Sequence, residues 1–254
     1  MRATQIRTAI ACGSYLSVLL VSLGGWFMIL ESEHRLFLQG ICSTPTGSWL
    51  TLGLKWIAAQ FAINPPTELI LPWFAMLLAM MPPLLTEQIA HVRFQSEARR
   101  RLRVIFLFVV AYGAVWMAAG VGLMFAAVAI GVAADAAAWP AIIPAIGVAV
   151  CWQFTPLKRA CLKRCHEAPR LSPSGAAADF DCARYGFSSA IWCVGACWAL
   201  MLIPLVADGL HVAAMAIVSA LSIVERALHV RRRGFIRLLA SDLTVLRKSQ
   251  GSNT

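Results

Sequence analysis

Two cysteine pairs are the residues of this chain best suited to chemistry. Cys161 and Cys165 directly follow an apolar segment, and Cys193 and Cys197 lie inside the next one. Residues four apart share one face of a helix, so the two sulfur atoms of each pair can converge on one ion. Thiolates prefer soft metals, which makes copper(I) the leading candidate. Zinc is the alternative if two more ligands join a pair.

The first pair lies in a basic segment. Lys163 and Arg164 separate its two cysteines, and nearby positive charge favours the thiolate form of an exposed cysteine. Thiols on the cytoplasmic side of a membrane are normally reduced, so we expect these to be free or metal-bound. Possible additional ligands are His166, Cys182 and Cys151. The alternative is that the two cysteines only pack a helix against the membrane.

Further soft donors accompany the pairs in the apolar segments. Met201 continues the spacing of Cys193 and Cys197, and the other donors are Met76, Met80, His211 and Met215. Together they would form a ladder of sulfur and imidazole groups across the membrane, where hard carboxylate ligands are costly. The alternatives are methionines that fill gaps and cysteines that line helix contacts. His211 alone fits an interfacial histidine bonded to a neighbour or to water.

Composition places the chain among membrane proteins. Its residues are 59% hydrophobic and only 13% charged, whereas soluble domains carry about a quarter charged residues. About 20 apolar residues cross a bilayer as a helix. The sequence therefore predicts a single all-α membrane domain with six spans, at 8–30, 69–90, 104–126, 138–157, 186–207 and 210–230.

The basic residues predict the orientation of these spans. Nearly all of the 22 Lys and Arg residues fall in segments that face the cytoplasm if both termini are inside, and only Arg35 and Lys55 do not. The connecting segments are an outer loop (31–68), a cytoplasmic cysteine-containing loop (158–185) and a basic tail (231–254). Within the outer loop, 48–63 is expected to form an interfacial helix or a lid over the bundle. The net charge of +10 then indicates contact with anionic lipid rather than with nucleic acid.

Polar residues inside the predicted spans are few. Gln153 is expected to bond across helices. Glu87 and Glu225 fall near cytoplasmic ends, where they can snorkel or pair with Arg93 or Arg226. The chain lacks a P-loop, an HExxH motif, a dinucleotide-binding turn and a CxxC motif. These absences argue against an enzyme. All five histidines are expected near membrane faces, which disfavours a haem-handling subunit.

Four segments carry a family resemblance. They are Phe74–Pro82, Trp152–Lys158 running into the first cysteine pair, Cys193–Met201 and Gly209–Met215. In this order the chain resembles the bacterial family of predicted metal-binding integral membrane proteins, a domain-of-unknown-function family linked to membrane copper chaperones. This chain has Trp152 where the family pattern favours tyrosine, and Leu210-His211 where it favours Met-Asn.

The resemblance implies a multi-pass protein of the bacterial inner membrane that supplies copper to copper-dependent oxidases. The resulting hypothesis is a chaperone that binds copper(I) and passes it across or along the membrane. Two alternatives stay open: a scaffold or sensor with structural zinc, and a membrane redox or haem-handling subunit. The oligomeric state and the acceptor, an oxidase or another copper-trafficking protein, are not determined by the residues.

Overall fold

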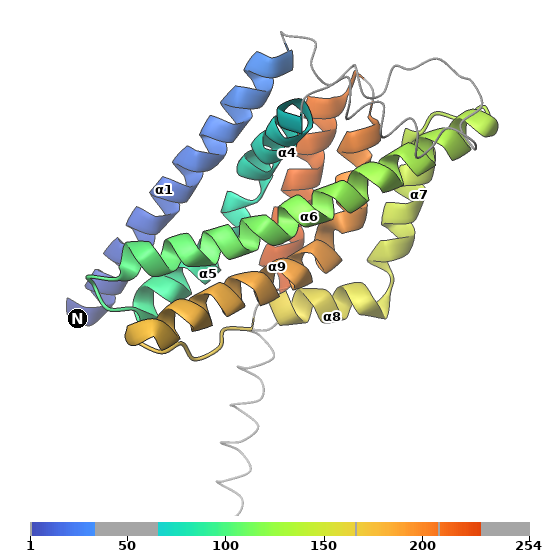
Figure 1. Cartoon of the computed structure of the whole chain (residues 1–254). Helices are drawn as coiled ribbons and strands as arrows, with labels where there is room; N and C mark the ends of the chain where they lie inside the picture. Colours follow the sequence, from blue (N-terminus) through green and yellow to red (C-terminus); the bar gives the residue numbers. More distant parts are fainter. Residues whose placement is uncertain (1, 34–65, 166, 208, 230–254) are drawn as a thin grey trace, which may run out of the picture.

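The structure, a computed structural model, describes residues 2–33, 66–165, 167–207 and 209–229. Helices make up almost all of this part of the chain, and it contains no strand, which confirms the all-α prediction. The helices are α1 (Arg2–Glu33), α4 (Pro66–Met80), α5 (Pro82–Gln95), α6 (Arg101–Ala136), α7 (Ile142–Gln153), α8 (Pro156–Cys165), α9 (Gly175–Val206) and a last helix, His211–His229, here called the C-terminal helix. Figure 1 shows them as one bundle.

Three described helices are long and apolar enough to cross a membrane: α6, α9 and the C-terminal helix. The pair formed by α4 and α5 makes a fourth if it is one broken span. Two shorter apolar helices fall below that length. One is Leu16–Glu31, which is part of α1, and the other is α7. Membrane character is therefore supported by three or four spans. The six-span topology and the orientation of the termini remain predictions.

The segment predicted as a span over 69–90 is bent by 68° between α4 and α5. Pro82 and Pro83 have no N–H groups, so the carbonyls of Leu78 and Ala79 lose their helical partners. Ser22 of α1 replaces one of them, donating a hydrogen bond of 2.5 Å to the Ala79 carbonyl. In an apolar bundle such a replacement is what makes a bend tolerable.

The span expected over 138–157 is also shorter than predicted. Its helix, α7, has 12 residues and ends at Gln153. Thr155 then caps α8: its Oγ1 accepts a hydrogen bond from the Lys158 amide, 3.2 Å away, and Pro156 occupies the first helical position. Figure 1 shows α8 turning away from α7 and crossing beside α9. The Thr-Pro pair was the sequence signal for this break.

The longest helices extend beyond their predicted spans. The 36 residues of α6 continue past 126 to Ala136, and α9 begins at Gly175, inside the segment expected to be loop 158–185. Arg100 and Arg103 hold the starts of α6 and α9 together through Asp179, at 2.9 and 2.8 Å. The interfacial helix expected over 48–63 and the tail 231–254 lie outside the described residues.

The contact between α6 and α9 depends on a small residue. Gly186 of α9 lies against the backbone of Phe108 of α6, and a Cβ atom there would overlap the Phe108 carbonyl and stand 3.1 Å from its Cα. Such close backbone approach is typical of helix pairs in membranes.

Gly186→Ala should therefore destabilise the protein, although alanine is the better helix former. We expect a loss of about 1–3 kcal/mol, because the methyl group must push two backbones apart. Thermal unfolding of the detergent-purified protein would measure it. Gly113→Ala is the matched control, since nothing lies within 4 Å of the position of its added Cβ. Equal melting temperatures for both variants would contradict the close-contact interpretation.

Candidate functional site

The two cysteine pairs of the sequence meet at one thiol. Cys193, fully buried on α9, forms side-chain hydrogen bonds with Cys165 at the end of α8 and with Cys197 one turn along α9. We call Cys165, Cys193 and Cys197 the thiol cluster. Cys193 is the member that contacts both of the others, so two helices distant in sequence share one set of sulfur ligands.

Two further side chains reach Cys193. The hydroxyl of Tyr112 on α6 donates to its Sγ over 2.9 Å, and Nη2 of Arg226 on the C-terminal helix donates over 2.8 Å. The Tyr112 hydroxyl also lies 3.8 Å from Sδ of Met81, at the α4–α5 bend. The second guanidinium nitrogen of Arg226, Nη1, donates to the Leu84 carbonyl of α5 over 3.0 Å. The site is thus assembled from both sides of the bend, from α6, α8 and α9, and from the C-terminal helix.

Cys161 and Cys165 are not the exposed pair that the basic sequence predicted. Both are buried, at 5% and 2% exposure. Burial raises the pKa of the Cys161 thiol against the opposing effect of Arg164, and the hydrogen bond with Cys193 together with burial raises that of Cys165. Arg164 instead stacks on the Trp192 ring, 4.5 Å from its centroid.

Cys161 and Cys165 have different surroundings. Cys161 packs against α9 at Gly195, where a Cβ atom would stand 2.7 Å from its Sγ. Cys165 reaches the Cys193 thiol. The structure therefore joins Cys165 to the second pair, whereas Cys161 serves the contact between α8 and α9.

The possible additional ligands do not gather at the thiol cluster. Cys182 is buried on α9, eleven residues before Cys193, which is about 16 Å along the helix. Cys151 is exposed on α7, and His166 lies outside the described residues. In the described part of the chain, no three His, Cys, Asp or Glu side chains form a group able to hold a metal ion. The arrangement suits an ion that needs two soft ligands better than one that needs four.

The expected methionine ladder is buried in the same core. Met76, Met80, Met201 and Met215 are all at most 3% exposed and belong to the apolar cluster that contains the three thiols. Their positions fit packing as well as metal relay. His211 lies at the far end of α9, with Nδ1 2.7 Å from the Pro204 carbonyl. That carbonyl belongs to the last turn of α9, where helical partners run out.

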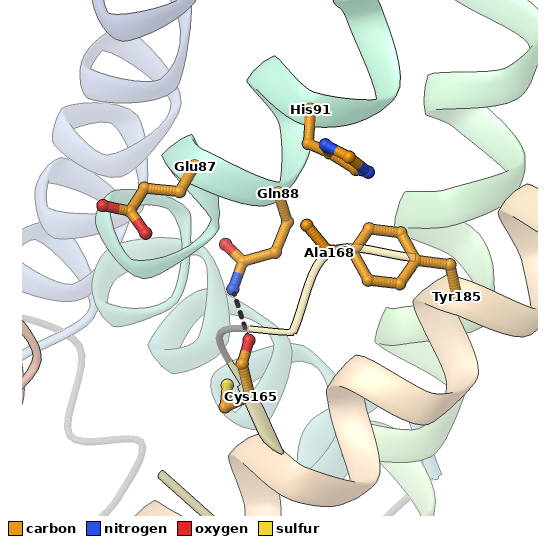
Figure 2. A pocket seen from close by; sticks show the side chains of 6 residues that line it. All are labelled: Glu87, Gln88, His91, Cys165, Ala168 and Tyr185. Atoms are coloured by element: carbon orange, nitrogen blue, oxygen red, sulfur yellow. Dashed lines mark hydrogen bonds between the residues drawn. The ribbon is translucent and has the colours of Figure 1, made fainter. Parts of the chain in front are cut away.

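A small pocket leads to Cys165 from outside the bundle. It has a volume of about 60 Å³ and is lined by Glu87, Gln88, His91, Cys165, Ala168 and Tyr185. Figure 2 shows Gln88 above Cys165, with its Nε2 donating to the Cys165 carbonyl over 3.3 Å. The other amide atom, Oε1, is buried and has no hydrogen-bond partner among the described residues. The pocket therefore offers an unsatisfied oxygen next to a ligand candidate.

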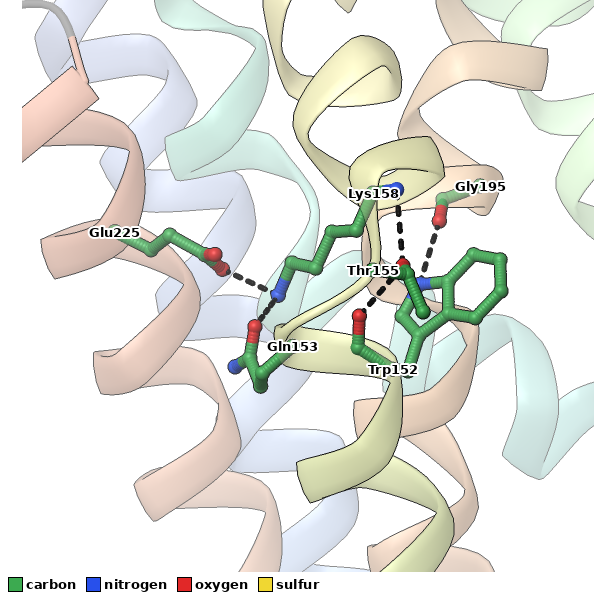
Figure 3. Close-up of polar contacts among 6 residues, drawn as sticks. All are labelled: Trp152, Gln153, Thr155, Lys158, Gly195 and Glu225. Carbon is green, nitrogen blue, oxygen red and sulfur yellow. Dashed lines mark hydrogen bonds and ion pairs between the residues drawn. The ribbon is translucent and has the colours of Figure 1, made fainter.

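Gln153 does bond across helices, but through an unexpected partner. The Lys158 ammonium, on a side chain only 2% exposed, lies between the Gln153 carbonyl oxygen and the Glu225 carboxylate, which is 2.8 Å away (Figure 3). Trp152 beside it donates to the Gly195 carbonyl over 3.0 Å. Glu225 therefore pairs with Lys158 and not with Arg226, which donates to Cys193.

Sequence reasoning missed Tyr112 and Arg226 as site residues. Arg226 was counted among the basic residues that face the cytoplasm, yet it is 9% exposed and bonds inward. One signal was available: Glu225 and Arg226 interrupt an otherwise apolar run, and a charge inside a span is a functional candidate by default. Tyr112 carried no comparable signal, since a lone tyrosine in an apolar helix fits packing equally well.

The Lys158–Glu225 pair predicts an asymmetric response to mutation. Glu225→Gln should cost about 2–3 kcal/mol of unfolding free energy, because it leaves a buried ammonium without its counter-charge. Lys158→Met should cost about 1 kcal/mol, because the Glu225 side chain is 30% exposed and water screens its charge. The double variant should be more stable than Glu225→Gln alone. Chemical denaturation in detergent would measure all three.

Arg103→Gln serves as the control for this cycle. It removes an ion pair in which the arginine side chain is 66% exposed, so its effect should stay below about 1 kcal/mol. Additive effects of Lys158→Met and Glu225→Gln would show that the two side chains do not form a coupled buried pair.

Comparison with known proteins identifies the family. Comparisons with curated proteins and with solved structures gave no match. A family model described as "PpoB2: Copper chaperone" matches residues 70–247, which is well over half of the 254 residues and includes the thiol cluster, Tyr112 and Arg226. The match confirms the resemblance drawn from the sequence motifs and supports copper handling. The chain therefore belongs to the PpoB2 copper chaperone family.

Proposed function

We propose that this protein is a membrane copper chaperone in which Cys193 is the common ligand of two successive copper(I) sites. The observation that carries the proposal is the position of Cys193 between Cys165 and Cys197. Copper(I) is stable with two soft ligands, so each neighbouring pair of thiols is a complete site. The cargo is held first by Cys165 and Cys193 and then by Cys193 and Cys197, or in the reverse order.

The transfer is a ligand exchange without a change of oxidation state. The bond from copper to Cys165 sulfur breaks as the bond to Cys197 sulfur forms. The proton released by the Cys197 thiol balances the one that Cys165 takes up. Because Cys193 stays bound throughout, the ion is never without a ligand in an apolar interior, where a bare charge is costly.

Access to this relay is at Cys165. The pocket beside it presents Glu87, His91 and Oε1 of Gln88, which has no partner among the described residues, and these groups attract a cation. Beyond Cys197, Met201 follows one turn along α9, about 6 Å further, and Met215 is buried in the same core. Met76 and Met80 supply more thioethers, and His211 lies where α9 ends.

The wider setting belongs to the same proposal. Six spans with both termini in the cytoplasm, in a bacterial inner membrane, agree with the charge distribution. The acceptor is a copper-dependent oxidase or another copper-trafficking protein, and the chaperone itself catalyses no chemical conversion.

Single cysteine variants separate the steps of the relay. Cys193→Ser should lower copper(I) affinity far more than Cys165→Ser or Cys197→Ser, because only Cys193 belongs to both sites. We expect more than about a tenfold difference between them, corresponding to about 1.4 kcal/mol. Competition with a chromogenic copper(I) chelator, on protein purified in detergent, measures this affinity.

Two variants serve as controls for this series. Cys151→Ser removes an exposed thiol away from the cluster, and Cys161→Ser removes one that packs on Gly195; neither should change affinity. Equal losses in all five variants, or stoichiometric zinc without copper(I) binding by the wild type, would overturn the proposal in favour of a structural or sensory protein.

A further inference from the structure

Arg226 carries a buried charge, and among the described residues none of its partners is a carboxylate. Arg226 takes no part in the ion pairs that join Arg100 and Arg103 to Asp179, and Lys158 to Glu225. Its guanidinium instead contacts the Cys193 thiol and the Leu84 carbonyl. A buried cation costs several kcal/mol unless an opposite charge compensates it. The group placed to supply that charge is the sulfur of Cys193.

We propose that Arg226 is the counter-charge of the copper(I) site and makes the site selective for a monovalent soft cation. This inference rests on the function proposed above. Two thiolates and one copper(I) ion together carry a charge of −1, and the guanidinium supplies +1. The loaded site is then neutral as a whole, which is the condition that a low-dielectric interior favours.

The same sum disfavours a divalent ion. Two thiolates and zinc(II) are already neutral, so Arg226 would leave an uncompensated positive charge inside the bundle. A third thiolate would restore neutrality, but Cys165, Cys193 and Cys197 do not form a three-ligand group able to hold a metal, so only two of the three thiols bind the ion at one time. Zinc would also lack the four ligands that it usually takes in structural sites.

The neighbouring charged groups change this balance little. Glu87, which lines the pocket at Cys165, is exposed, so water screens its charge. Lys158 and Glu225 cancel each other at 2.8 Å, and Tyr112 contributes a neutral hydroxyl that donates to the same sulfur. The bond from Arg226 to the Leu84 carbonyl holds the guanidinium in place from the first turn of α5. The bend between α4 and α5 therefore helps to position the charge beside the thiols.

Neutral variants of Arg226 test the proposal through affinity and selectivity. Arg226→Met should lower copper(I) affinity by roughly a hundredfold, as expected when a buried charge loses its partner. It should also shift the ratio of zinc(II) to copper(I) affinity toward zinc by more than about tenfold. Arg226→Gln, which keeps a donor for the Leu84 carbonyl, should behave like Arg226→Met. Arg226→Lys keeps the charge and should stay within a few-fold of the wild type.

A charge-compensation cycle separates a counter-charge from a structural support. Cys193→Met replaces one thiolate by a neutral thioether. The two ligands and copper(I) are then neutral together, so the total charge is +1 when Arg226 is present and zero in the Arg226→Met background. The substitution at Cys193 should therefore cost much copper(I) affinity beside Arg226 and little in the Arg226→Met background. If Arg226 only supports the fold, the two effects add.

The outcomes distinguish this inference from the function on which it rests. No copper(I) binding by the wild-type chain overturns the proposed function. Copper(I) binding by the wild type with unchanged affinity and selectivity in both neutral variants overturns the counter-charge alone. Size-exclusion chromatography and thermal unfolding identify any variant that fails to fold. Should Arg226→Met be such a variant, Arg226→Gln takes its place in the cycle.

Discussion

The contacts of the Cys193 sulfur atom require the correct placement of most helices of the bundle. Cys193 accepts hydrogen bonds from Tyr112 of α6 and Arg226 of the C-terminal helix, and contacts Cys165 of α8. No water is available inside an apolar bundle to replace a lost partner, so all of these groups must be held in place by helix packing. Each irregularity of the fold serves that purpose: the bend between α4 and α5, the break before α8, and the close approach of α6 to α9.

The irregularities follow from a few residues that interrupt helices. Pro82 and Pro83 bend the α4–α5 pair and free a carbonyl that Ser22 satisfies. Thr155 and Pro156 end α7 early and start α8, so that the chain turns and Cys165 reaches α9. Gly186 and Gly195 then allow α6 and α8 to approach α9. The position of the thiol cluster thus depends on broken helices.

Predictions from residue types agreed with the structure and the family match better than predictions of which residues lie next to each other. Apolar content predicted membrane helices, and the two cysteine pairs together with the motifs around them pointed to copper, which the family match supports. The bounds of the spans over 69–90 and 138–157 were predicted without their breaks, although prolines marked both. The pairing of Glu225 and the inward position of Arg226 were missed, because periodicity says which residues share a face but not which neighbour that face meets.

The sequence by itself predicted that this protein lies in a lipid bilayer and that its side chains suit a soft metal ion. Both depend on composition: long apolar runs require a bilayer, and thiols with thioethers prefer soft metals whatever their arrangement. Only the tertiary structure decided which thiols contact one another and which charge lies beside them. Cys165 meets Cys193 across 28 positions of sequence, and Arg226 meets it across 33. Contacts over such separations are set by helix rotation, bends and packing, and no local pattern encodes these.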